Sequence, residues 1–228
     1  IKKELAKKNI EEAISFAMTL NNLGVLYRKM RKYEEVEKCY RKVIRVLSEF
    51  KEKEEVKSHL ASVFNNLGSL LVEQGKVAEG IHYLNKAINE YGKYLDLELK
   101  MKINLALAKG FEKLKDEKSS LHYFKAGLLS YLLFREYGMQ SVNFIHLLEK
   151  AEKLADSEEL KGDAKLTRLA ILKLYYDRKI KELPKVKCGK IGEIILRAEK
   201  GKKRDFEVSS DEDRAILYLV TDLSGFGF

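Results

Sequence analysis

Residues 18–44 read MTLNNLGVLYRKMRKYEEVEKCYRKVI, and residues 62–88 read SVFNNLGSLLVEQGKVAEGIHYLNKAI. The two stretches align without a gap. Their shared motif, NNLG, places Leu23 and Leu67 44 residues apart. A chain that repeats itself at such a period is built from stacked copies of one supersecondary unit, because a single copy cannot bury its own apolar face.

A third and more divergent copy follows. Residues 102–128 read KINLALAKGFEKLKDEKSSLHYFKAGL, and the pair His122-Tyr123 follows His82-Tyr83 by 40 residues. The paired asparagines and the glycine of the first two copies are missing from it. The repeat therefore predicts three consecutive units over the first two thirds of the chain.

Each copy has the pattern of a helix, a short polar break and a second helix. The breaks fall at Arg31-Lys32, Gly75-Lys76 and Lys115-Asp116. A small residue stands in the first helix where two helices must cross closely, and a large residue stands in the matching column of the second helix. The small residues are Gly24, Gly68 and Ala108, and the large ones are Tyr40, Leu84 and Phe124.

These residues resemble the tetratricopeptide repeat, whose first helix carries a leucine, a small residue and an aromatic residue at fixed spacing, as Leu23, Gly24 and Tyr27 do here. The spacing of 40–44 residues is similar to that of kinesin light chain repeats. The resemblance covers about residues 10–135. It implies an all-α fold, a right-handed superhelical solenoid of antiparallel helix pairs with a helical C-terminal cap.

Three regions are expected on this basis. Residues 1–135 form three helix pairs, residues 136–182 form a degenerate fourth pair, and residues 183–228 form a helical cap beyond the single proline, Pro184. A last helix is predicted at about 210–223, because Ser209 and Glu212 have the spacing of a capping box. The apolar run at 215–220 is also compatible with a strand.

Composition excludes several classes of protein. The chain has 228 residues, 45% of them apolar, and a formal net charge of +9. No run of about 18 apolar residues exists, so no membrane span is expected. We predict a soluble, cytoplasmic protein without a signal peptide, and the start at Ile1 indicates a trimmed chain. The abundance of Lys and Glu is typical of thermophilic proteins.

No catalytic, metal-binding or cofactor-binding motif is recognisable. Cys39 and Cys188 are too few and too far apart for a zinc site, and they are expected to be free thiols. The four histidines do not cluster in sequence. We therefore predict a protein that is not an enzyme, with no cofactor and no metal.

Asparagine pairs recur at one place in the first two copies. Asn22 and Asn66 precede the leucines of their repeats, so stacking would set their amides at one height on successive helices. An amide both donates and accepts, so such a ladder suits the backbone of an extended peptide. The resemblance to kinesin light chains implies the same contact. The predicted groove comprises Asn21, Asn22, Arg28, Lys29, Ser62, Asn65, Asn66, Ser69, Lys102 and Lys109.

The predicted function is a non-catalytic adaptor that binds a peptide or partner segment, with the lysines and Arg28 favouring acidic side chains. Asn66 and Lys102 also match two positions of the clamp with which some chaperone-binding tetratricopeptide domains hold a C-terminal carboxylate, whereas Asn21, Val25 and Ala106 differ from it. Self-association through the Phe-rich C-terminal end is a further expectation.

Two alternatives remain open. The repeats could be a sensor module of a larger transcription regulator or ATPase. Alternatively, residues 161–190, whose net charge is +7, could attract nucleic acid. The basic residues of that window are not interleaved with the exposed aromatic residues of a stacking surface, for which Tyr175 and Tyr176 are the only nearby candidates, and this disfavours nucleic acid. The basic residues considered are Lys161, Lys165, Arg168, Lys173 and Arg178.

Overall fold

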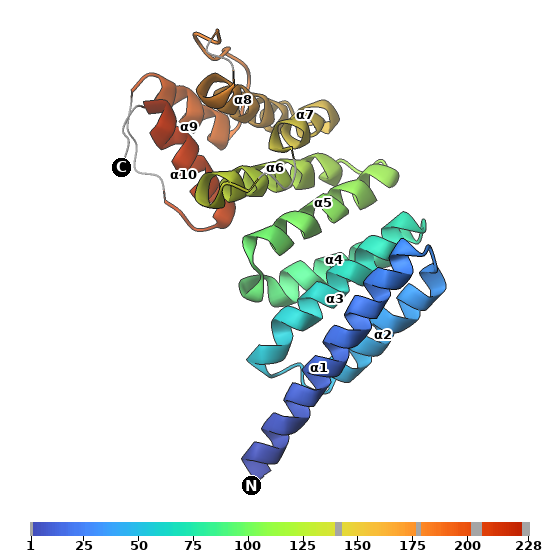
Figure 1. The fold of residues 1–228 in the computed structure, drawn as a ribbon. Helices are drawn as coiled ribbons and strands as arrows, with labels where there is room; N and C mark the ends of the chain where they lie inside the picture. Colours follow the sequence, from blue (N-terminus) through green and yellow to red (C-terminus); the bar gives the residue numbers. More distant parts are fainter. Residues whose placement is uncertain (1, 140–142, 177–178, 202–206, 225–228) are drawn as a thin grey trace. The chain divides into compact units, whose positions relative to one another are not determined.

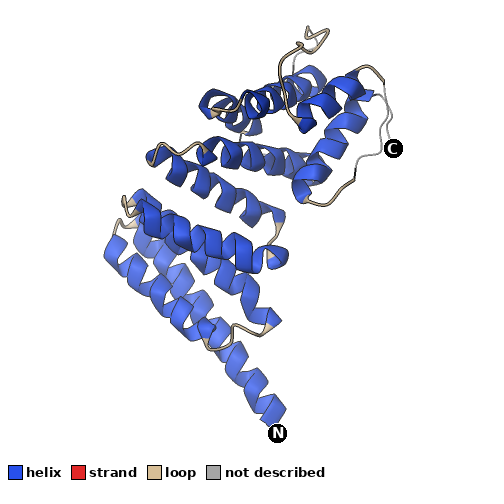
Figure 2. Ribbon diagram, turned by 180° about the vertical axis from the view of Figure 1, so that it is seen from behind, coloured by secondary structure: helices blue, strands red, loops and turns tan. Residues whose placement is uncertain are grey.

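The computed structural model describes residues 2–139, 143–176, 179–201 and 207–224. All regular elements in these ranges are helices, which confirms the all-α prediction (Figure 2). The chain falls into two compact units, residues 1–99 and residues 100–228. The predicted region boundaries at 135 and 182 both lie inside the second unit.

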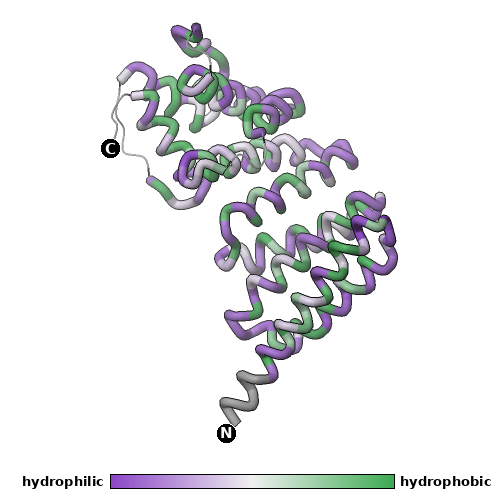
Figure 3. Tube along the Cα trace, viewed as in Figure 1, coloured by the Kyte–Doolittle hydropathy of each residue, from purple (hydrophilic) through white to green (hydrophobic). Residues whose placement is uncertain are grey.

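The first unit contains the two clearest repeats as two helical hairpins (Figure 1). In it, α2 packs against both α1 and α3, and α3 packs against α4. Hydrophobic and hydrophilic residues alternate along these helices (Figure 3), and most of the buried residues of α2, α3 and α4 are apolar. The elements are α1 (Lys2–Lys29), α2 (Tyr33–Ser48), α3 (Glu54–Glu73), α4 (Val77–Tyr91) and a 3-10 turn (Gly92–Tyr94).

The small residues of the repeat lie where the helices cross. A methyl group added to Gly24 would come within 2.6 Å of the Tyr40 ring. One added to Gly68 would come within 2.7 Å of Leu84 and 2.8 Å of the backbone oxygen of Gly80. The columns of small and large residues therefore predicted these contacts correctly, and in the second hairpin the two backbones touch.

The polar breaks share one backbone geometry. Arg31, Gly75 and Lys115 occupy the same place in the three copies, and all three have a positive φ, of 59°, 85° and 55°. The N–H of the next residue then returns to the helix: Lys32 donates to the carbonyl oxygen of Tyr27, and Asp116 donates to that of Phe111. This left-handed residue ends the first helix of each pair and turns the chain back.

The second unit begins with the third helix pair and the predicted fourth (Figure 1). The helix α7 packs against α6 and α8. Leu148 of α7 lies so close to Gly127 of α6 that a methyl group there would come within 2.9 Å of it. The elements are α5 (Leu97–Lys113), α6 (Lys118–Tyr137), α7 (Phe144–Leu154) and α8 (Glu158–Tyr175).

The C-terminal helices α9 (Lys190–Glu199) and α10 (Asp211–Ser224) complete the second unit. The buried carboxylate of Asp163, on α8, accepts a hydrogen bond from the backbone N–H of Gly192 (2.7 Å) and so holds the first turn of α9. Burial raises the pKa of this carboxyl group, and the backbone donors oppose that shift.

The helix α10 settles one open alternative and corrects the predicted cap residue. The run at 215–220 is helical, so the strand alternative was wrong. The cap is Ser210 rather than Ser209, because the Ser210 hydroxyl accepts from the backbone N–H of Asp213 (3.0 Å). The Asp213 carboxylate reaches back to the N–H of Ser209 (3.1 Å), and Glu212 does not make the predicted contact among the bonds of the described residues.

A half-buried histidine, His122, joins α5 to α6 in the second unit. Its Nδ1 donates to Oδ1 of Asn104 (2.9 Å), and its ring stacks on Phe111 with centroids 5.4 Å apart. Burial, with the nearby charges of Lys118 and Lys125, lowers its pKa from 6.5 to about 4. The folded protein therefore holds this histidine neutral.

We expect Gly80→Ala to lower the free energy of unfolding by about 1–3 kcal/mol, because its methyl group would come within 2.7 Å of the Gly68 oxygen. The matched control is Gly92→Ala, which meets no atom within 4 Å at a helical φ of −51° and should be neutral or slightly stabilising. Urea unfolding measures both. Equal effects of the two substitutions would contradict the close backbone approach.

The positive φ shared by the turns predicts opposite changes in stability for two substitutions, one that removes a glycine and one that introduces a glycine. Gly75→Ala should destabilise the protein by about 1 kcal/mol through its positive φ alone, because its surroundings are open. Lys115→Gly should stabilise it by about 0.5–1 kcal/mol, because glycine tolerates the same φ. Thermal unfolding of the two variants is the measurement, and shifts of the same sign would be inconsistent with a shared turn.

The lowered pKa of His122 predicts a pH dependence of stability. Its folded pKa lies below its unfolded value, so stability is complete above pH 6.5 and falls as the pH drops toward 4. Between pH 7 and pH 5 we expect a loss of about 1–2 kcal/mol that His122→Gln removes. His146→Gln, on the exposed surface of α7, is the control and should retain the slope. Denaturant titrations at several pH values test this.

Candidate functional site

Two polar stripes lie side by side on the first helices of the first unit, α1 and α3. Each stripe follows the three- and four-residue spacing that places side chains on one face of a helix. We call this surface the α1–α3 face. Its residues are Met18, Asn21, Val25 and Arg28 on α1, and His59, Ser62, Asn66, Ser69 and Glu73 on α3.

Three amides form a relay at the centre of the α1–α3 face. Nδ2 of Asn65 donates to Oδ1 of Asn66 (3.3 Å), and Nδ2 of Asn66 donates to Oδ1 of Asn21 (2.9 Å). Asn65 is buried, and its Oδ1 has no hydrogen-bond partner in the described part of the chain. The relay fixes the orientation of the amides and directs the Nδ2 group of Asn21 away from it.

The structure pairs the asparagines differently from the ladder of Asn22 and Asn66. The partner of Asn66 is Asn21, 45 residues away, whereas Asn22 is exposed beside it. The next contact along the face, the ion pair between Arg28 and Glu73, has the same separation of 45 residues. Equivalent residues of the two repeats are 44 positions apart. A residue of α1 therefore contacts the residue of α3 that follows its own equivalent by one position.

A small pocket of about 40 Å³ opens at one end of the α1–α3 face. Its floor is apolar and its rim carries an amide, an imidazole and a hydroxyl group. The pocket lies between three helices, which contribute Ala17, Met18 and Asn21 from α1, Val43 and Leu47 from α2, and His59, Ser62 and Val63 from α3.

The other end of the α1–α3 face carries an ion pair. Arg28 forms its ion pair with Glu73 at the surface, with about a third of the arginine side chain exposed. Arg28 is therefore partly neutralised by its own neighbour. Lys29 is exposed one residue further along α1, and Ser69 is half-buried on α3.

The remaining predicted groove residues lie in the second unit. Lys102 and Lys109 are both exposed, and their separation of seven residues places them on one face of α5. Between them on the same helix, Asn104 turns inward and donates to the backbone oxygen of Lys100 (3.0 Å).

Two residues of the predicted basic cluster, Arg168 and Lys173, bind acidic side chains of the second unit. Arg168 binds Glu152 of α7 through two nitrogen atoms (2.6 and 3.2 Å). Lys173 binds Glu199 of α9 and the backbone oxygen of Lys181, both at 2.6 Å. Lys161 is exposed and lies 3.5 Å from Glu158, Lys165 is half-buried, and Arg178 lies outside the described residues.

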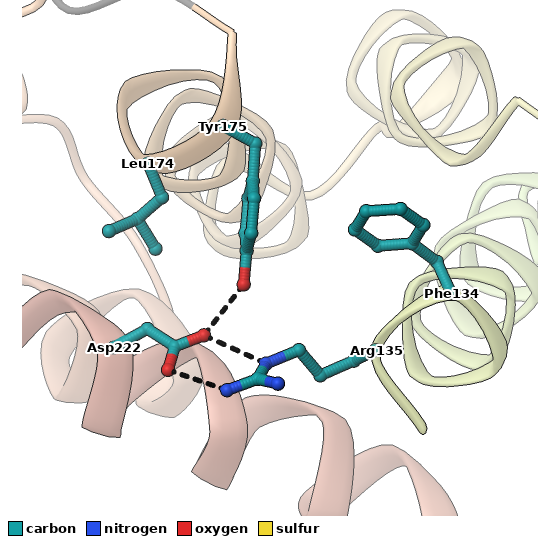
Figure 4. A pocket seen from close by; sticks show the side chains of 5 residues that line it. All are labelled: Phe134, Arg135, Leu174, Tyr175 and Asp222. Carbon is teal, nitrogen blue, oxygen red and sulfur yellow. Dashed lines mark hydrogen bonds and ion pairs between the residues drawn. The ribbon is translucent and has the colours of Figure 1, made fainter. Parts of the chain in front are cut away.

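A larger pocket, of about 430 Å³, lies among α6, α8 and α10 (Figure 4). The carboxylate of Asp222 accepts two hydrogen bonds from Arg135 (3.1 Å each) and one from the Tyr175 hydroxyl (2.7 Å). Phe134 and Leu174 form its apolar walls. Burial and the neighbouring Asp222 raise the pKa of Tyr175. The polar groups therefore satisfy one another, and they bind the last helix to the unit.

No group of three or more His, Cys, Asp and Glu residues within the described ranges is arranged to hold a metal ion. None of the described helices combines the length and the apolarity needed to cross a membrane. Cys39 is buried and Cys188 half-buried, and neither forms a disulfide.

Sequence reasoning missed Met18 and His59. Both line the small pocket, and both lie on the stripes at helical spacing, since Met18 precedes Asn21 by three residues and His59 precedes Ser62 by three. Extending each stripe by one turn toward its N-terminal end would have found them.

Comparison with known families agrees with this geometry. Residues 17–50 and residues 61–94 each match the tetratricopeptide repeat, and the two matches begin 44 residues apart. No curated protein sequence matches the chain significantly. Tetratricopeptide repeats are in general protein–protein interaction modules. The first match covers the C-terminal half of α1 and all of α2, and the second covers most of α3 and all of α4, so these two hairpins are tetratricopeptide repeats.

Proposed function

We propose that the first unit is a protein-interaction scaffold that binds an extended peptide segment across its α1–α3 face. The observation that supports this most directly is the amide relay from Asn65 through Asn66 to Asn21, beside a pocket with an apolar floor. Oriented amides suit a peptide backbone, and the pocket suits a small apolar side chain. The protein acts without catalysis in this role.

The backbone contact would use the amides at the edge of the relay. Oδ1 of Asn21 accepts the hydrogen bond from Asn66, so the Nδ2 group of Asn21 is left to donate to a ligand. Asn22 is exposed next to it. A peptide carbonyl group could accept from Asn21, while a peptide N–H group could donate to the exposed Asn22. The relay holds Asn21 in position, so binding would require little ordering of that side chain.

We further propose that the partner is acidic. The chain carries a net charge of +9, and Lys29 on α1 is exposed. Arg28 contributes less than its charge suggests, because Glu73 already neutralises part of it. Exposed charges of this kind contribute little each and are screened by salt, so the attraction is weak and decreases as the salt concentration rises.

Selection of a random-peptide phage library on the immobilised chain tests the proposal. We expect the chain to enrich peptides with a small apolar residue next to acidic ones. A synthetic copy of an enriched peptide should bind at least about tenfold more weakly to the Asn21→Ala, Asn66→Ala double variant, because two directional hydrogen-bonding groups are lost. Fluorescence anisotropy gives the dissociation constants.

Asn89→Ala is the matched control, because it removes an exposed asparagine from α4 instead. It should bind the peptide like the unmodified chain. Met18→Asp, which places a negative charge at the small pocket, should weaken binding as the double variant does. Enriched peptides that bind the double variant with undiminished affinity would refute the proposed face.

A further inference from the structure

The exposed apolar residues of the first unit concentrate on α1. Phe16, Leu26 and Met30 are 41%, 53% and 51% exposed, and Leu23 lies half-buried among them. They form a stripe on the side of α1 that faces away from its buried residues, such as Ala13 and Ala17. This stripe is separate from the α1–α3 face. We call it the outer stripe of α1.

The equivalent residues of the second repeat are buried between helices. The residues of α3 that are 44 positions further on are Leu60, Leu67 and Leu70, and each is fully buried. They are covered because α3 packs against both α2 and α4, whereas α1 packs mainly against α2. The outer stripe of α1 therefore has the residues of a helix–helix interface without a helix covering it in the described structure.

The spacing of the stripe is symmetric. Its residues, at 12, 16, 19, 23, 26 and 30, alternate steps of four and three, which is the spacing of a two-helix seam. The pattern reads the same in both directions about residue 21. If a second α1 packs antiparallel, Phe16 meets Leu26 of the second copy, and Thr19 meets its Leu23.

The polar members of the stripe are compatible with this arrangement. The Thr19 hydroxyl donates to the backbone oxygen of Ser15 (3.0 Å), so its burial would leave no donor unsatisfied. The symmetry also sets Glu12 beside Met30 of the second copy, whose neighbours Lys29 and Arg31 are exposed and basic. Each end of the seam would thus pair an acidic group with basic ones.

We propose that two copies of the chain associate through the outer stripes of α1 in an antiparallel, two-fold arrangement. The seam covers residues 12–30, a length of about 27 Å. An interface of this size is small, so we expect a dissociation constant of about 1–100 µM. The α1–α3 face lies on another side of the helix, and the dimer does not depend on peptide binding.

Sedimentation equilibrium over about a hundredfold range of concentration tests the association. The unmodified chain should change from monomer to dimer, and Leu26→Glu should weaken the dimer at least about tenfold. Met18→Glu is the matched control, because it makes the same kind of change at a residue of α1 that is 51% exposed but lies on the α1–α3 face. It should leave the dimer intact.

Charge rescue tests the direction of the helices. The Phe16→Lys and Leu26→Glu variants should each be monomeric alone and should form a mixed dimer together, because the antiparallel arrangement sets position 16 of one copy opposite position 26 of the other. A monomeric wild-type chain, or a dimer indifferent to Leu26→Glu, would overturn the proposal. Failure of the mixture to associate would overturn the antiparallel arrangement, and circular dichroism would establish that each variant is folded.

Discussion

The contact on which the first unit depends is the one between the backbones of α3 and α4. A methyl group on Gly68 would come within 2.8 Å of the Gly80 oxygen, and one on Gly80 within 2.7 Å of the Gly68 oxygen. This reciprocal approach fixes the separation and crossing of the two helices. Since the side of α3 that carries Asn66 is set by the side that meets α4, the close packing also orients the α1–α3 face.

Much of the fold could be predicted from the sequence, because the repeat imposes the same packing twice. The columns of Gly24 with Tyr40 and Gly68 with Leu84 identified real contacts between helices. The cap of α10 was misplaced by one residue because Ser209 and Ser210 are each followed, three positions later, by an acidic residue. Spacing alone could not distinguish them, whereas the hydrogen bond from Asp213 does.

The candidate site was harder to predict, because it depends on contacts between helices and not on periodicity within one. The repeat sets Asn22 level with Asn66, but neighbouring helices meet one residue out of register, so Asn21 is the partner. Likewise, residues 161–190 hold many basic residues along the chain, yet Glu152 and Glu199, which neutralise two of them, lie outside that window. A count of charges along a sequence does not reveal which ones a fold brings together.

The ion pair between Arg28 and Glu73 has a consequence for the rates of binding. Because Arg28 is paired with Glu73 on the α1–α3 face itself, an acidic partner of the kind proposed would be attracted mainly by the net charge of the whole chain. Salt would then slow the encounter of the two molecules and change their lifetime together much less. The time a partner remains bound would be governed by the amides and the small apolar pocket, both of which salt screens weakly.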